Sequence, residues 1–303
     1  MLPPSAGPSP NSMETFFRRV AVLGTGLIGG SFALALRKHS PNTAIVGWDK
    51  EHVLRHAFER GAIDEGFADL SPAVVGADLI YIALPVGHTI EMLPEVARLA
   101  APHALVTDAS STKRSVSKVA EDSFQAEGAR FLGGHPMAGK EISGIAAADA
   151  DLFRGAKYAL IADPLEKSAT QDPRIGEFVT LIQELGAEPV WLDAESHDRA
   201  AAIVSHLPQL VAVALAGVVR GQTDQTGLPL TLAGRGLRDA LRLAGSPYSV
   251  WRDIILTNSD NLDRVLEQFI QALEQLRGEL RTRALADEFA AAGEIYRILR
   301  DLQ

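Results

Sequence analysis

Val20-Ala21-Val22-Leu23-Gly24-Thr25-Gly26-Leu27-Ile28-Gly29-Gly30 is the stretch of the sequence that decides the fold. A short apolar run leads into a G-x-G-x-x-G pattern, and an amphipathic segment over residues 29–38 follows. Between a strand and a helix, this pattern is typical of the turn that binds the pyrophosphate of a dinucleotide. Gly24 allows the tight turn, Gly26 lets the backbone approach the phosphates, and Gly29 lets the helix pack on the strand. The positive end of the helix dipole then faces the phosphates.

Asp49 supports the same interpretation from the end of the second apolar run. It follows the first glycine by about 25 residues, where a carboxylate accepts hydrogen bonds from the adenosine ribose. A 2′-phosphate would meet a like charge there, and Lys50 is the single nearby cation, so we expect NAD rather than NADP. The expected cofactor-binding residues are Gly24, Gly26, Leu27, Ile28, Gly29, Asp49, Leu84 and Pro85.

Apolar β-rich runs alternate with amphipathic segments through the first part of the chain. The runs lie at residues 20–23, 44–48, 79–84, 105–108, 130–133, 158–161 and 189–192. Helical patterns lie between them, at residues 29–38, 51–60, 89–100, 113–127 and 175–185. Most runs lack polar alternation, which is typical of strands covered on both faces. The sequence therefore predicts an α/β fold with a Rossmann-like, doubly wound, mostly parallel sheet over residues 15–193.

The remaining chain, residues 194–303, predicts an all-helical domain for substrate binding and dimerisation. We find no strand pattern there, only Ala- and Leu-rich periodic segments interrupted by Gly and Pro. We expect this domain to supply the far wall of the active site and a subunit interface. Ala200–Val219 is nearly long and apolar enough for a membrane span, but polar residues and Pro208 interrupt it. We therefore expect a helix buried at the centre of a soluble domain.

The composition restricts the functions that are possible. The chain has 303 residues, 47% of them hydrophobic, so it can bury the cores of two domains. It has no cysteine, which excludes disulfides, thiolate-bound zinc, iron–sulfur clusters and a catalytic cysteine. A net charge of −9 lacks the basic footprint of a nucleic-acid binder. Residues 1–14 are predicted to be a flexible tail without signal-peptide features, so we expect a cytoplasmic protein with no membrane partner and no metal.

Polar segments follow the predicted strands where an open α/β sheet binds its ligands. Asp108-Ala-Ser-Ser-Thr-Lys113 follows one strand, and Gly133-Gly-His-Pro-Met-Ala-Gly-Lys-Glu141 follows the next. Together with GTGLIGGS, GWD, VSHLP and GLRDALRLAGSPYSVWRDI, these segments resemble the prephenate/arogenate dehydrogenases of tyrosine biosynthesis. The resemblance covers about residues 18–260. HPMAG and SHLP are much more specific motifs than the glycine pattern.

The resemblance implies oxidative decarboxylation of prephenate to 4-hydroxyphenylpyruvate, with hydride transfer to NAD⁺. His135 matches the family's catalytic histidine, which takes the proton of the substrate hydroxyl. Ser111 matches a serine that links the hydroxyl, the histidine and the nicotinamide. One of Ser110 and Ser111 is also well placed to cap a helix starting near residue 112, and the pattern alone does not separate them. Arg242 matches the clamp on a substrate carboxylate, with Arg238 one turn earlier on the same face.

Two departures from the family pattern concern the substrate. The common motif SHLPH ends in Gln209 here, so a neutral amide replaces a histidine near the substrate side chain, beside His206 in the same motif. Lys140 follows HPMAG, where many relatives carry a neutral residue. A cation facing the pocket would favour prephenate over arogenate, whereas a surface pair with Glu141 would leave the preference open.

Other functions remain open at this stage. An arogenate-specific or dual-specificity cyclohexadienyl dehydrogenase fits the same motifs. A β-hydroxyacid or imine reductase also pairs a Rossmann domain with a helical one, but it would not explain HPMAG. A non-enzymatic NAD-sensing dimer is the third alternative. The family and the apolar helical half both favour a homodimer. His197, at the start of the helical segment, has no assigned role.

Overall fold

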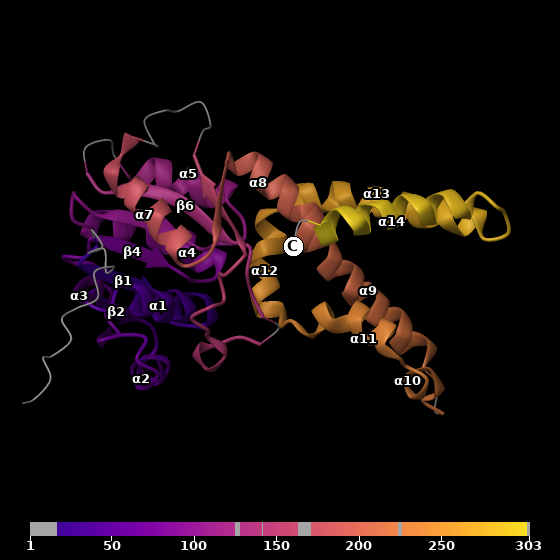
Figure 1. The fold of residues 1–303 in the computed structure, drawn as a ribbon, viewed down its shortest axis with the longest axis horizontal. Coiled ribbons are helices and arrows are strands. Elements are labelled where there is room, and N and C mark those ends of the chain that lie inside the picture. Colours follow the sequence, from indigo (N-terminus) through magenta and orange to yellow (C-terminus); the bar gives the residue numbers. More distant parts are fainter. Residues whose placement is uncertain (1–16, 125–127, 141, 163–170, 224–225, 302–303) are drawn as a thin grey trace, which may run out of the picture. The chain divides into compact units, whose positions relative to one another are not determined.

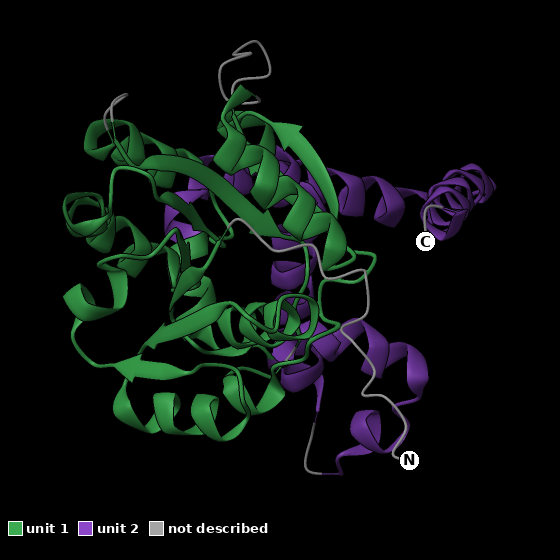
Figure 2. Ribbon diagram, turned by 60° about the vertical axis from the view of Figure 1, so that its left-hand side comes forward, with its two compact units in different colours: residues 1–197, 246–254 green, residues 198–245, 255–303 purple. Residues whose placement is uncertain are grey.

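The computed structural model describes residues 17–124, 128–140, 142–162, 171–223 and 226–301. They form two compact units (Figure 2). The first unit contains the described residues up to 197 and residues 246–254, and the second contains residues 198–245 and the described residues from 255 onward. The short segment Ser246–Ile254 thus belongs with the first unit, although it lies in the part of the sequence expected to form the helical domain. The predicted tail over residues 1–14 lies outside the described residues.

The first unit is built on an eight-stranded sheet in the order β3-β2-β1-β4-β5-β6-β7-β8. Figure 1 labels β1, β2, β4 and β6 of this sheet. The strands are β1 (Arg19–Leu23), β2 (Ala44–Trp48), β3 (Glu65–Phe67), β4 (Leu79–Ile82), β5 (Leu105–Asp108), β6 (Arg130–Pro136), β7 (Lys157–Ile161) and β8 (Glu188–Leu192). Strands β1 to β6 all run parallel to one another. Strand β7 pairs antiparallel to β6 and parallel to β8. The strand order reverses between β1 and β4, which is the switch point where such sheets bind ligands.

Helices cover both faces of this sheet, as the lack of polar alternation predicts. The helices are α1 (Leu27–His39), α2 (Glu51–Glu59), α3 (Leu70–Val74), α4 (Val86–Leu99), α5 (Arg114–Ser123) and α7 (Pro173–Glu184). Val20 and Val22 of β1 belong to the core beneath α1, α2 and α7, and Ala21 and Leu23 belong to the core beneath α3, α4 and α5. Two fully buried apolar layers confirm the doubly wound α/β prediction.

Two strands differ from the sequence prediction: β3 was not predicted, and β6 is longer than predicted. Strand β3 has only the residues Glu65, Gly66 and Phe67, too few for an apolar run, and it pairs at the sheet edge with β2. Strand β6 continues to Pro136, beyond the predicted end at residue 133. Antiparallel pairing with β7 extends it, because His135 lies opposite Ala159 and Pro136 opposite Tyr158.

Among its described residues the second unit contains helices and no strand, as predicted. Its elements are the end of α8 (Ala194–Ala201), a π-helical turn (Ala202–His206), α9 (Leu207–Gln222), α10 (Leu228–Thr231), α11 (Arg235–Leu241), a 3₁₀ turn (Arg242–Gly245), the end of α12 (Tyr248–Thr257), α13 (Ser259–Glu279) and α14 (Leu285–Asp301). Pro208 explains the π-helical turn, because it lacks an N–H and its ring crowds the carbonyl four residues earlier.

The prediction that Ala200–Val219 is a centrally buried helix is wrong for the single chain. Ile203, Val204, Val213 and Val218 each expose half or more of their surface. The continuous helix Ala194–Gln222 is long and apolar enough to cross a membrane, and only 22% of its most apolar window is buried. The small core of this unit comprises Ala202, Leu262 and Val265 with a few half-buried neighbours. Apolar helix faces are therefore left for another surface to cover.

Candidate functional site

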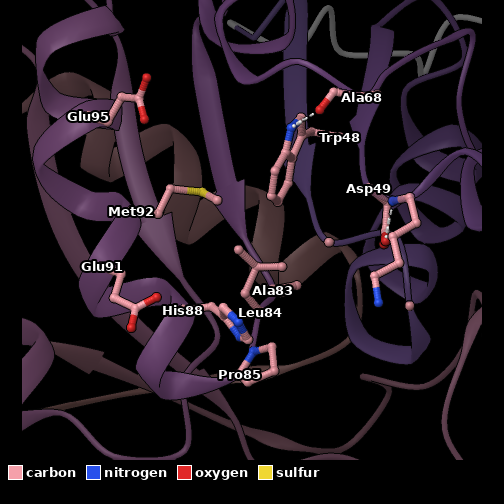
Figure 3. Close-up of a pocket in the computed structure, with 13 residues that line it drawn as sticks. Trp48, Asp49, Ala68, Ala83, Leu84, Pro85, His88, Glu91, Met92 and Glu95 are labelled. Carbon is pink, nitrogen blue, oxygen red and sulfur yellow. Dashed lines mark hydrogen bonds between the residues drawn. The ribbon is translucent and has the colours of Figure 1, made fainter.

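A cavity of about 820 Å³ opens where β1, β2 and β4 end, at the switch point of the sheet (Figure 3). Its wall combines the glycine turn, the end of β2 and the first turns of α4. The lining residues are Gly24, Gly26, Trp48, Asp49, Lys50, Ala68, Ala83, Leu84, Pro85, His88, Glu91, Met92 and Glu95. Leu84 and Pro85 were expected here. Leu27 and Ile28 begin α1 and do not line this cavity, although both are half-buried.

The glycines of the turn have the geometry that a dinucleotide requires. Gly24 has a φ of +91°, and a Cβ there would lie 2.5 Å from the carbonyl oxygen of Ala83. A Cβ on Gly29 would overlap the carbonyl oxygen of Gly24, so the helix packs close to the turn. A Cβ on Gly26 would meet nothing within 4 Å. The backbone at Gly26 is therefore open to the cavity, just before the N-terminus of α1.

The carboxylate of Asp49 is held in place at the cavity wall. Its Oδ2 accepts hydrogen bonds from the backbone N–H of Thr25 at 2.8 Å and from the Thr25 hydroxyl at 3.3 Å. Its Oδ1 accepts from the backbone N–H of Lys50 at 2.7 Å. Glu91 and Glu95 also line the cavity (Figure 3), so negative charge outweighs that of Lys50. These carboxylate acceptors fit ribose hydroxyls, and their charge opposes an additional phosphate.

His135 lies on β6 and faces a second histidine. Its Nδ1 is 2.9 Å from Nε2 of His197, and the two rings meet edge to face with centroids 5.1 Å apart. His135 is half-buried, whereas His197 is only 3% exposed. No role was predicted for His197 from the sequence. The two residues are 62 positions apart, and no local pattern connects them.

The two serines after β5 do not cap a helix through their side chains. Helix α5 begins at Arg114, its N-cap residue is Lys113, and the side chain of Lys113 makes no capping hydrogen bond. The capping prediction is therefore wrong, because the helix starts later than expected. Ser110 is 3% exposed, and its hydroxyl has no hydrogen-bond partner among the described residues. Ser111 is the more exposed of the two.

Lys140 pairs with the loop that follows the HPMAG motif. Its Nζ lies 3.0 Å from Oδ2 of Asp149 and donates to the carbonyl of Ala147 at 3.1 Å. A backbone hydrogen bond from Asp151 and the bond from Lys140 hold the pKa of the Asp149 carboxyl below its usual value. Glu141, the partner that the sequence suggested for Lys140, lies outside the described residues.

The remaining expected substrate residues lie in the second unit. His206 is 1% exposed, and its Nδ1 is 3.2 Å from the side-chain amide nitrogen of Asn258, which also donates to the carbonyl of Asp198 at 2.8 Å. Gln209 is 3% exposed, and its Oε1 has no hydrogen-bond partner among the described residues. Arg238 on α11 and Arg242 in the following turn are both exposed. The described residues contain no cluster that could hold a metal ion.

Two family models cover most of the chain. Residues 32–190 match the nucleotide-binding domain of prephenate dehydrogenase, and residues 193–292 match its dimerization domain. The chain belongs to the prephenate dehydrogenase family. The resemblance seen in the HPMAG and SHLP motifs is thereby confirmed.

The similar proteins are named for different substrates. The prephenate dehydrogenase of Lactococcus lactis is 34% identical over 86% of this chain and 70% of its own. The cyclohexadienyl dehydrogenase of Zymomonas mobilis is 32% identical over 87% and 88%. The crystal structure of A. aeolicus prephenate dehydrogenase, in complex with hydroxyphenyl propionate and NAD⁺, superposes with a TM-score of 0.80 at 28% identity, covering 96% of this chain and 99% of that one. Synechocystis arogenate dehydrogenase gives a TM-score of 0.70 at 28% identity, over 93% and 96%.

Proposed function

We propose that the protein catalyses the NAD-dependent oxidative decarboxylation of prephenate to 4-hydroxyphenylpyruvate, a step of tyrosine biosynthesis. One observation carries the proposal: in a member of this family, His135, paired with His197 of α8, lies on a strand of the sheet whose switch point opens into a cavity suited to a dinucleotide. Part of the cavity wall follows β4, the two serines follow the adjacent strand β5, and His135 lies on the next strand, β6.

The residues that would hold the cofactor are those of the glycine turn and Asp49. The N–H groups at the start of α1 bind the pyrophosphate, and the carboxylate of Asp49 accepts hydrogen bonds from the adenosine ribose. Leu27 and Ile28, together with Leu84 and Pro85, complete the proposed cofactor contacts. Bound NAD⁺ would supply the acceptor for the hydride that leaves the hydroxyl-bearing ring carbon as the ring carboxylate departs as CO₂.

His135 takes the proton of the substrate hydroxyl in this proposal. With Nδ1 directed at His197, we assign Nε2 as the atom that accepts the proton. Nδ1–H of His135 then donates to Nε2 of His197, which fixes the tautomer and the ring orientation. The positive charge that develops on His135 strengthens this hydrogen bond. His197 is thus a positioning residue for the proton acceptor.

The other assignments concern substrate recognition. Ser111 donates a hydrogen bond that connects the substrate hydroxyl with His135. Arg242 binds a substrate carboxylate through two parallel hydrogen bonds, and Arg238 contributes a second cation. Gln209 and His206 belong to the segment that contacts the substrate side chain, where Gln209 can donate or accept. Lys140 forms a surface pair with Asp149, which leaves the preference between prephenate and arogenate open at this position.

The exposed apolar helices of the second unit support a homodimer. Phe289, Ile295, Tyr296 and Ile298 of α14 are each at least half exposed, and none of the residues of α14 is buried in the single chain. Patches of this kind mark association surfaces. If a second copy of the chain covers these apolar side chains, they do not need a membrane to shield them from water. A small anionic substrate fits a cytoplasmic enzyme. The acidic net charge disfavours nucleic acid.

Arogenate is the second candidate substrate, alone or with prephenate. The Zymomonas mobilis cyclohexadienyl dehydrogenase and the Synechocystis arogenate dehydrogenase support it. Gln209 also supports it, because its Oε1 can accept from the arogenate ammonium group.

Appearance of reduced nicotinamide, followed by absorbance with each substrate and with NAD⁺ or NADP⁺, tests these assignments. We expect the highest kcat/KM with prephenate and NAD⁺. A higher value with arogenate would transfer the proposal to that substrate. Absence of reduced cofactor with both substrates would overturn it and leave the reductase and NAD-sensing alternatives.

A further inference from the structure

We infer that the buried ion pair of Asp108 and Lys113 positions Ser111 and His135 relative to each other. Asp108 is the last residue of β5, and Lys113 precedes α5. Nζ of Lys113 lies 2.6 Å from Oδ2 of Asp108, and neither side chain is exposed to solvent. The inference rests on the proposed function, because that function gives Ser111 and His135 their roles.

The pair holds both backbone groups of Gly134, the residue before His135. Nζ of Lys113 donates to the carbonyl oxygen of Gly134 at 2.6 Å, and Oδ1 of Asp108 accepts from its N–H at 3.1 Å. The ladder between β5 and β6 ends at Thr107 and Leu132. Beyond that point, the side chains of the ion pair continue the connection between the two strands.

The same carboxylate also fixes the loop that carries Ser111. Oδ2 of Asp108 accepts a hydrogen bond from the backbone N–H of Ser110 at 3.0 Å. Both ends of the loop from Asp108 to Lys113 are therefore tied to one buried pair. Because that pair also holds Gly134, a shift of either charge would move Ser111 and His135 relative to each other.

The packing around Gly134 leaves little freedom for this arrangement. A Cβ on Gly134 would lie 2.6 Å from the backbone oxygen of Asp108 and 3.1 Å from the ring of Tyr158. The buried hydroxyls of Tyr81 and Tyr158 lie 3.3 Å apart nearby. Burial raises the pKa of both tyrosines, so they stay neutral and the charge of Asp108 is compensated by Lys113. Apolar residues would fill such a site with less desolvation, which points to a positional role for the charges.

The test compares removal of one charge with removal of both. Lys113→Met keeps the apolar stem but leaves Asp108 buried without its cation, so we expect a lower melting temperature and a lower kcat. The double variant Lys113→Met with Asp108→Asn has no buried charge, and we expect it to recover most of the melting temperature. Its kcat should stay at least tenfold below the wild-type value, because the neutral pair no longer holds Gly134 and Ser110 as the charges did. NAD⁺ affinity, followed by the fluorescence of Trp48 in the cavity wall, should change less than threefold.

The matched control removes the ion pair of Arg174 and Asp172, which lie 2.7 Å apart in the same unit and are remote in sequence from the loop 108–113 and from His135. Arg174→Met with Asp172→Asn should lower stability and leave kcat unchanged. A double variant of Lys113 and Asp108 that recovers both the melting temperature and the wild-type kcat would overturn the inference.

A second readout keeps this test separate from the proposed function. The imidazole NMR signals of His135, identified by their loss in His135→Asn, should shift in the Lys113 and Asp108 double variant and stay in place in the control. Unshifted signals would contradict the positioning role even if the wild-type protein were inactive. Wild-type inactivity with both substrates would overturn the proposed function alone.

Discussion

Replacing Gly26 by alanine should lower the affinity for NAD⁺ with little effect on the stability of the fold. A Cβ at this position would meet no protein atom within 4 Å and would project where the pyrophosphate approaches the backbone. Gly24 offers the matched comparison two residues earlier. Its φ of +91° and the 2.5 Å approach of a Cβ to the carbonyl of Ala83 make alanine strained there without any ligand.

The expected magnitudes follow from these contacts. Gly26 precedes α1 as its N-cap residue, where exchanging glycine for alanine costs about 0.5–1 kcal/mol. Alanine at Gly24 costs about 1–3 kcal/mol in backbone strain, with the steric overlap in addition. For NAD⁺, we expect Gly26→Ala to lose at least about tenfold in affinity, which corresponds to about 1.4 kcal/mol.

Thermal unfolding without ligand and titration with NAD⁺ measure the two effects independently. Gly26→Ala should melt within about 4 °C of the wild-type protein, because 1 kcal/mol corresponds to about 2–4 °C for a chain of this size. Gly24→Ala should melt clearly lower. Wild-type NAD⁺ affinity in Gly26→Ala would refute the assignment of this turn to the pyrophosphate, as would a loss of stability equal to that of Gly24→Ala.

Four further predictions test individual residues. His135→Asn should lower kcat by about 10²–10⁴-fold with little change in NAD⁺ affinity, and an unchanged kcat in steady-state assays would remove its role as proton acceptor. Asp49→Ser should raise the kcat/KM ratio of NADP⁺ to NAD⁺, since it removes the charge that opposes a 2′-phosphate; a constant ratio would contradict this. Arg242→Gln should weaken substrate binding by about 2–4 kcal/mol, seen as a higher KM, whereas a change in melting temperature alone would make Arg242 structural. The hydrogen bond from Arg174 holds the pKa of Asp172 below its usual value, so the stability that the Asp172 carboxylate contributes is complete above about pH 4 and is lost as the pH falls through the lowered pKa. Asp172→Asn should therefore reduce the fall in melting temperature at acidic pH, and an unchanged fall would refute the linkage.

The fold was predictable because its determinants are local. The strand–glycine–helix unit of β1 and α1, and the unbroken apolar runs of β4 and β5, require both faces of the sheet to be covered. The cofactor turn was predictable for the same reason, since the roles of Gly24 and Asp49 depend on their positions after two consecutive strands.

The features that escaped prediction depend on residues distant in the sequence. His197 meets His135 across 62 positions, and the antiparallel partner β7 extends β6 so that His135 lies on a strand. Lys113 is a helix-flanking lysine by sequence, and only the fold shows that it is fully buried and donates to the carbonyl of Gly134, 21 positions away. The exposed apolar face of α9 has the composition of a buried helix. It was predicted to be buried in the core because a sequence pattern does not distinguish a core helix from a helix that a second chain would cover.

Deuterium tracing tests the chemistry at its source. Prephenate labelled on the ring carbon that bears the hydroxyl should deliver its deuterium to the reduced nicotinamide, one label for each CO₂ released, with slower turnover than unlabelled substrate in single-turnover measurements. Label recovered in water, or CO₂ released without reduced cofactor, would contradict direct transfer coupled to decarboxylation.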